Sequence, residues 1–93
     1  MRLRNEERVT FVITSVNTGA ALPRIVMLFH RLHVEIQALS MVRSDTAETV
    51  RMFVTTLAKE NRGGRIEASL SKLVEVRAVN IQRAVVKHVT AEE

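Results

Sequence analysis

The residues of this chain best suited to chemistry lie in a short polar turn, Asn17-Thr18-Gly19-Ala20, which is followed by a helix-like pattern. The first turn of a helix has free backbone N–H groups and the positive end of the helix dipole, and both attract an anion such as a carboxylate. A plain strand-to-helix turn needs the same residues, because Asn and Gly tolerate turn conformations. The residues alone leave both interpretations open.

Two histidines, His30 and His33, lie three positions apart near the end of the same helical pattern, a spacing that permits two metal ligands on one face. No third ligand is evident, so we interpret them as surface histidines at a helix end, where a positive ring suits the dipole. The chain has no cysteine, which excludes disulfides, thiolate metal sites and a cysteine nucleophile. We therefore predict no metal site.

Other arrangements that would indicate an enzyme are missing from the sequence. We find no Ser, His and Asp set, no pair of carboxylates in a supporting context and no phosphate-binding loop. Met27, Met41 and Met52 lie in or beside apolar stripes, where core filling explains them. The sequence therefore predicts a protein with no catalytic residue and no cofactor.

Composition indicates one small domain. The 93 residues are 46% apolar and 26% charged, with a formal net charge of +4 at pH 7. The arginines are scattered along the chain, so we interpret most of them as a solvated surface and not as a nucleic-acid-binding patch. No apolar stretch suits a signal peptide or a membrane span, which favours a cytoplasmic protein with no membrane partner.

Six elements are predicted to position the turn. In chain order they are a strand over 8–16, a helix over 22–32 with Pro23 in its first turn, strands over 34–43 and 50–55, a helix over 66–73 that follows Gly63 and Gly64, and a strand that begins near 74. The tail from 83 to 93 either extends the last strand or caps the core. Its final residues, Glu92 and Glu93, are expected to be loose.

This order predicts an α+β fold of the ferredoxin-like βαββαβ type, with a four-stranded antiparallel sheet and both helices on one face. The other face is predicted to be too apolar for an ideal solvent face, so we expect a partner to cover part of it. Its predicted residues are Thr10, Val12, Leu39, Met41, Arg51, Phe53, Arg77 and Val79. A chain this short has one small core, which also favours self-association.

The turn and the helix after it resemble a known family. The stretch from Asn17 to Arg24 is similar to the Asn-x-x-Gly-x-Leu-x-Arg pattern of ACT domains in acetolactate synthase small subunits. Ile36 and Leu39 match that family's second strand, and residues 66–76 resemble its Ile-Glu-x-x-Leu-x-Lys-Leu-Val-Asp-Val segment. The resemblance covers roughly residues 8–82 and implies that 1–93 is a single ACT domain.

The resemblance implies a non-catalytic regulatory subunit that binds the large catalytic subunit of acetolactate synthase, a thiamine-diphosphate-dependent enzyme of branched-chain amino acid biosynthesis. It also implies a homodimer whose sheets join side by side, with a branched-chain amino acid, valine first, bound between the subunits. Longer members carry a second domain after the ACT domain, so this chain corresponds to a short form or to part of a longer subunit. The implied effector-binding residues are Asn17, Thr18, Gly19, Ala20, Ala21, Leu22, Glu35 and Ile36.

Two positions depart from the family pattern. The family's loop glycine falls on Ala20, with Gly19 one place early, and the Ala20 methyl group would narrow the space for a carboxylate beside the backbone. A family asparagine falls on Glu35, whose carboxylate would pair with a ligand ammonium or repel a ligand carboxylate, unless it is simply an exposed strand residue. Both departures bear on the identity of the effector.

Two other functions stay open at this point. A free-standing ACT sensor would use the same pocket to control another enzyme or regulator. RNA binding by the open sheet would suit a basic βαββαβ chain, but the stacking aromatics of RRM domains are missing, since Phe53 alone is expected on that face. We therefore rank RNA binding last and predict no nucleic-acid partner.

Overall fold

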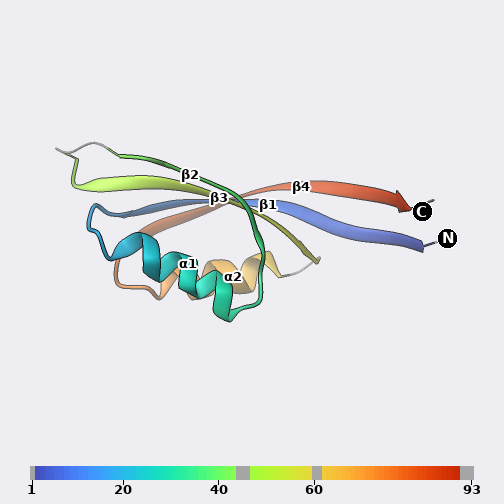
Figure 1. Cartoon of the computed structure of the whole chain (residues 1–93), viewed down its shortest axis with the longest axis horizontal. Coiled ribbons are helices and arrows are strands. Elements are labelled where there is room, and N and C mark those ends of the chain that lie inside the picture. Colours follow the sequence, from blue (N-terminus) through green and yellow to red (C-terminus); the bar gives the residue numbers. More distant parts are fainter. Residues whose placement is uncertain (1, 44–46, 60–61, 91–93) are drawn as a thin grey trace.

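The elements follow the predicted order. The computed structural model describes residues 2–43, 47–59 and 62–90, and the side chains of 8–43, 47–57 and 62–83. The strands form one antiparallel sheet in the order β2-β3-β1-β4, and both helices cover the same face of it (Figure 1). The predicted ferredoxin-like βαββαβ fold is confirmed. The elements are β1 (Arg2–Val16), α1 (Ala21–Arg31), β2 (Ile36–Val42), β3 (Thr49–Lys59), α2 (Gly63–Ser71) and β4 (Val76–Thr90).

β1 is a central strand, because it pairs with β3 on one side and with β4 on the other. Its residues Val9, Phe11 and Ile13 are fully buried, since alternate side chains of the strand point to the face that the helices cover. Phe11 meets Phe29 of α1 edge to face, with ring centroids 5.5 Å apart. Further core residues come from both helices, from β3 and from the residue before Glu35 and β2: Ile25, Leu28, Ile66, Leu70, Val50, Met52, Val54 and Val34.

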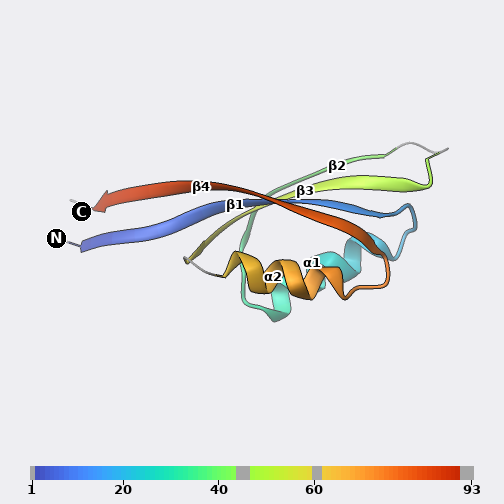
Figure 2. The ribbon, with the colours of Figure 1, turned by 180° about the vertical axis from the view of Figure 1, so that it is seen from behind.

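β1 and β4 are much longer than the sequence pattern predicted. Each strand runs for 15 residues, and they pair from Arg2 opposite Thr90 to Ser15 opposite Val76. Beyond the helices they continue side by side as a two-stranded ribbon as far as Arg2 and Thr90 (Figure 2). The tail therefore extends the last strand. The predicted loose end at 92–93 lies outside the described residues.

A β-bulge in β2 reverses the face of the residues that follow it. The register shifts just after Ile36, so that Leu39 lies opposite Val54 and Met41 lies opposite Met52. Cross-strand partners share a face, and both partners in β3 belong to the core. The prediction that Leu39 and Met41 lie on the open face was wrong, because one extra residue exchanges the two faces of a strand.

A second irregularity, at the start of β4, has the same effect on Val79. The register of β1 and β4 shifts between Thr14 and Ser15, and Val79 lies opposite the buried Ile13. Val79 therefore packs against the core and not on the open face, where it was predicted. Four of the predicted open-face residues do lie there, since they alternate with core residues in β1 and β3: Thr10, Val12, Arg51 and Phe53.

α2 begins earlier than the sequence pattern predicted. It starts at Gly63, where a glycine break was expected, and not at Ile66. A Cβ on the buried Gly63 would lie 3.2 Å from the side chain of Arg83 in β4, so the missing side chain lets the helix start come close to the sheet. Both helices are short, and among the described residues none is long and apolar enough to cross a membrane.

Phe11→Ala tests the packing of the helices on β1. Loss of a fully buried ring, and of its contact with Phe29, is expected to lower the free energy of unfolding by about 3–5 kcal/mol. Phe53→Ala is the matched control, because Phe53 is half-buried on the open face and its loss is expected to cost about 1 kcal/mol. Urea unfolding at one fixed protein concentration measures the free energy of unfolding of the wild type and of both variants. Equal losses would contradict this description of the core.

Candidate functional site

The predicted effector turn connects the end of β1 to the start of α1. The Thr18 N–H donates to the Val16 carbonyl at 3.0 Å, and the Ala21 N–H donates to the Thr18 carbonyl at 3.3 Å. Ala20, which precedes the helix, makes no side-chain cap hydrogen bond. Gly19 has no positive φ and no neighbour within 4 Å of a Cβ built on it. The turn is therefore closed by its own backbone.

The start of α1 offers an anion fewer donors than the sequence suggested. The Ala21 N–H is bonded within the turn, and the Arg24 N–H donates to the Ala20 carbonyl at 3.3 Å. Pro23 lies in the same first turn and has no N–H. A helix N-terminus binds anions through a set of free N–H groups. Here Leu22 supplies the remaining one of the first turn, so the helix backbone alone is a weak anion site.

Asn17 joins this turn to the connection between β2 and β3. Its backbone N–H donates to the Glu48 carbonyl at 3.0 Å, and its Nδ2 donates to the Ala47 carbonyl at 3.1 Å. The sequence-based hypothesis has the Asn17 amide contacting a ligand, whereas in the structure this amide is engaged within the chain. Asn17 therefore positions the turn against the hairpin, and any contact with a ligand would be additional to that role.

A cavity of about 200 Å³ lies between the turn and the β2–β3 hairpin. Asn17, Thr18 and Gly19 line it from the turn, and Leu22 and Pro23 line it from the first turn of α1. The structure thus brings four of the eight predicted effector residues, Asn17, Thr18, Gly19 and Leu22, to one cavity.

The opposite wall of the cavity comes from the hairpin and consists of Met41, Arg43, Val50 and Met52. Val50 and Met52 are buried, and Met41 is 36% exposed at the sheet edge. Arg43 directly follows β2, is exposed, and is the one charged side chain among the described residues that line the cavity. The cavity can therefore hold a small apolar molecule with a negatively charged end.

Sequence reasoning missed this hairpin wall. Met41 was placed on the wrong face because the bulge after Ile36 has no signature in the alternation of residues. Arg43 had a usable signal, since it immediately follows the second strand. In the observed sheet order, Val42 and the β1 residue Thr14 both pair with Arg51, which places Arg43 near the end of β1. Assuming that sheet order for the sequence would have brought Arg43 to the effector turn.

The other predicted effector residues lie away from the cavity within one chain. Ala20 is exposed and does not line it, and Ala21 is fully buried in the core. Ile36 begins β2 five positions before Met41, a separation of about 16 Å at roughly 3.3 Å per residue. The exposed Glu35 precedes Ile36. A site that also includes Glu35 or Ile36 therefore needs a second copy of the chain, and the buried Ala21 has no access to a ligand.

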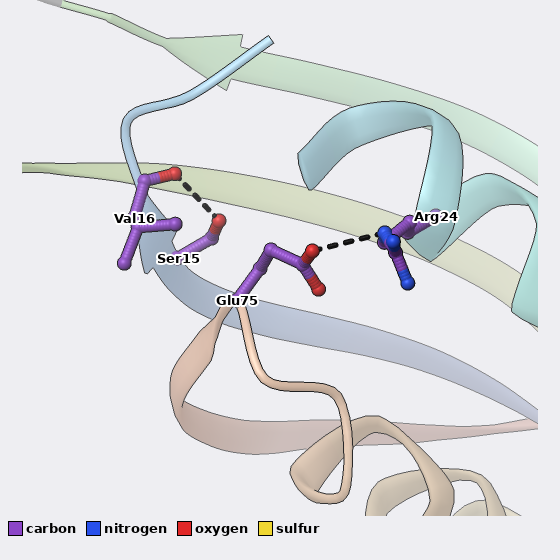
Figure 3. Close-up of polar contacts among 4 residues, drawn as sticks. All are labelled: Ser15, Val16, Arg24 and Glu75. Atoms are coloured by element: carbon purple, nitrogen blue, oxygen red, sulfur yellow. Dashed lines mark hydrogen bonds and ion pairs between the residues drawn. The ribbon is translucent and has the colours of Figure 1, made fainter. Parts of the chain in front are cut away.

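A second polar cluster braces the start of α1 against the end of β1 (Figure 3). Arg24 Nε lies 2.9 Å from Glu75 Oε2, and the side chains are 61% and 11% exposed respectively. The Glu75 carbonyl accepts the Val16 N–H at 2.9 Å, and Ser15 Oγ donates to the Val16 carbonyl at 2.8 Å. Glu75 Oε1 is buried without a hydrogen-bond partner among the described residues. Since a buried carboxylate needs its cation, Arg24 is held at this position.

The two histidines at the C-terminal end of α1, His30 within it and His33 just after it, have a structural explanation. His33 has a φ of 57°, and its N–H donates to the His30 carbonyl at 3.0 Å. The next N–H, of Val34, donates to the Phe29 carbonyl at 3.0 Å. These bonds and the left-handed residue are typical of a helix C-terminus. Within the part of the chain that the structure describes, no three His, Cys, Asp or Glu residues are placed to hold a metal ion.

The aromatic residues bear on the RNA-binding alternative. The chain has three phenylalanines and no tyrosine or tryptophan. Phe11 and Phe29 are buried in the core, which leaves Phe53 on the open face. Recognition of single-stranded RNA by an open sheet uses several stacking rings on that face. The structure therefore gives this alternative no added support.

No family model matches the sequence, and no curated protein matches it in a sequence comparison. Comparison with solved structures does find matches. The ACT domain of the GTP pyrophosphokinase of Chlorobium tepidum superposes with a TM-score of 0.69 at 10% identity, over 84% of this chain and 86% of that chain. This chain has an ACT-like fold.

Two further solved structures share the ACT-like fold. A putative PII-like signaling protein from Thermus thermophilus matches with a TM-score of 0.62 at 22% identity, over 96% of this chain and 94% of that one. The regulatory subunit of aspartate kinase from Thermus thermophilus matches with a TM-score of 0.60 at 8% identity, over 91% of this chain and 59% of that one. At these identities the likeness shows the fold alone, and the acetolactate synthase assignment stays a prediction.

Asn17→Ala tests the connection between the turn and the hairpin. Loss of the Nδ2 hydrogen bond to Ala47 is expected to lower the free energy of unfolding by about 0.5–1.5 kcal/mol. The variant should stay folded by circular dichroism, because the turn is closed by its backbone. Thr18→Ala is the control, since Thr18 is exposed in the same turn and its loss should change stability by less than about 0.5 kcal/mol. Urea curves that coincide for all three proteins would show that the Asn17 contact is incidental.

Proposed function

We propose that this chain is a non-catalytic regulatory domain that binds a small apolar amino acid in the cavity between the β1–α1 turn and the β2–β3 hairpin. The observation that carries the proposal is the lining of this cavity, which is largely apolar and has Arg43 as its one charged residue among those described. Its volume of about 200 Å³ is below the range of roughly 300–1,000 Å³ that holds drug-sized ligands. A small metabolite with a short apolar side chain fits these properties.

The sequence resemblance supplies the finer proposal. It implies that the partner is the large catalytic subunit of acetolactate synthase and that the effector is valine, leucine or isoleucine. The domain would bind that subunit and transmit amino-acid binding as a shift between two populated states. The aspartate kinase neighbour, itself a regulatory subunit, supports a division of roles between a catalytic and a regulatory chain.

β2 is the sheet edge best suited to the proposed homodimer. The strand has no charged residue and no proline, and it is exposed from residue 37 to residue 42. Leu39 and Val42 are 42% and 69% exposed. Edge strands usually carry charges, prolines or covers that prevent pairing with another chain. Antiparallel pairing with β2 of a second copy would bring the Glu35 end of one strand to the cavity end of the other, and so place Glu35 and Ile36 near the predicted effector residues of the turn.

Leu39→Lys tests this dimer. We expect a species that is dimeric at tens of micromolar, an order-of-magnitude concentration for a specific interface. The variant should be monomeric there, since a lysine on each copy would face the other across the two-fold axis. Val74→Lys is the matched control, because Val74 is 76% exposed but follows α2, away from β2. Sedimentation velocity measures the oligomeric state of the wild type and of both variants. A dimeric Leu39→Lys protein would show that β2 is not the interface.

Reconstitution with the cognate large subunit tests the regulatory role. The chain is expected to bind that subunit and to make its acetolactate formation sensitive to valine, leucine or isoleucine. The measurement is the rate of acetolactate formation during titration with each amino acid. Calorimetry on the chain alone provides the control, since binding of valine without any effect on the large subunit would instead indicate a free-standing sensor. Absence of binding to all three amino acids would contradict the proposed function.

A further inference from the structure

The described lining of the cavity presents only positive charge to a ligand. Arg43 is the one charged side chain among the described residues that line it, and none of these residues is acidic. Several of the nearby backbone donors are already used, since the N–H groups of Thr18 and Ala21 are bonded within the turn. Pro23 has no N–H to offer. The Leu22 N–H remains as a neutral donor, and Arg43 is the one charged donor in the described lining, so Arg43 is the strongest partner there for a carboxylate.

We infer that Arg43 is the residue that selects carboxylate ligands in this cavity, and that an amino group on the ligand is dispensable. The inference rests on the proposed function, because it concerns the same cavity. A guanidinium binds a carboxylate through charge-assisted and often paired hydrogen bonds, which are stronger than those of a neutral donor. Within one chain an ammonium group would meet no carboxylate in the described lining, since Glu35 lies near the opposite end of β2. The proposed dimer would bring a second copy's Glu35 to this end, and the Glu35→Gln variant below measures that contribution.

The rest of the lining defines the tail of the ligand. Leu22, Met41 and Met52 supply apolar surface, and methionine side chains adapt to branched or straight tails of similar size. The ligand class is therefore a short apolar monocarboxylate. Valine belongs to this class, and so do the corresponding 2-oxo acid and isovalerate, which keep the carboxylate and the branched tail but lack the amino group.

Calorimetric titration with valine, isovalerate and valinamide tests the inference. Valinamide keeps the amino group and replaces the carboxylate with a neutral amide. The folded wild-type chain is expected to bind valine and isovalerate with affinities within about threefold of each other, and valinamide at least about tenfold more weakly. Arg43→Gln should weaken the binding of both valine and isovalerate about tenfold or more, whereas Arg43→Lys, which keeps the charge, should retain part of the affinity for both.

Arg51→Gln is the matched control, because Arg51 is exposed on the open face of β3 and does not line the cavity. Its affinities should equal those of the wild type. Unchanged binding by Arg43→Gln, verified as folded by circular dichroism, would overturn the role of Arg43. An affinity for valine more than tenfold higher than that for isovalerate would overturn the inference that the amino group is dispensable. In that case, a Glu35→Gln variant with weaker binding of valine but unchanged binding of isovalerate would identify a second copy's Glu35 as the group that binds the amino group.

The outcomes also separate this inference from the proposed function. Binding of isovalerate without binding of any branched-chain amino acid would leave the role of Arg43 standing and would contradict amino-acid sensing. Binding of valine through Arg43 without any effect on the large subunit would again support the inference and contradict the proposed regulatory role. Failure of both carboxylates to bind the wild-type chain at millimolar concentration would overturn the inference together with the proposed site.

Discussion

The burial of one face of β1 is the constraint on which the rest of this structure depends. β1 pairs with β3 and β4 at once, and the contact of Phe11 with Phe29 joins the sheet to α1. β1 ends at Val16, and the following residue bonds to Glu48 in the connection between β2 and β3. The turn and the hairpin therefore meet at the same end of the sheet. The cavity between them is a consequence of where the central strand stops.

The fold was predictable because its strongest signals are local. Alternation over 8–16 and helical spacing over 22–32 identify β1 and α1, and the order of elements limits the topology. The faces of β2 and β4 were not predictable, because each contains an irregularity that depends on its partner strand. The outer parts of β1 and β4 were missed for a related reason. Their pairing with each other, residue by residue, is a non-local property that neither segment shows alone.

The candidate site was likewise predictable only where its residues form a local pattern. The residues from Asn17 to Leu22 carry a local turn pattern, and the structure places most of them at the cavity. Arg43, Met41 and Met52 were missed because they reach the cavity only through the pairing of β2 with β3. The helix start was expected to be a stronger anion site than it is, because Pro23 suits a first helical turn and also removes one of its donors. Pro23 thus favours the start of α1 and at the same time weakens the anion binding expected of that helix start.

The two walls of the cavity differ in local stability, and this difference determines which wall a bound ligand stabilises. The turn side is braced by the Arg24–Glu75 ion pair and by the hydrogen bond from Val16 to Glu75. On the hairpin side, Val50 and Met52 are buried in β3, whereas Met41 and Arg43 come from the edge strand β2 and the residue after it. β2 is exposed along nearly its whole length, and such segments have the lowest local stability in a fold. A ligand that contacts both walls therefore stabilises chiefly β2. If a second copy pairs with the same strand, ligand binding and association act on one element, and linkage requires that each changes the affinity of the other by the same factor.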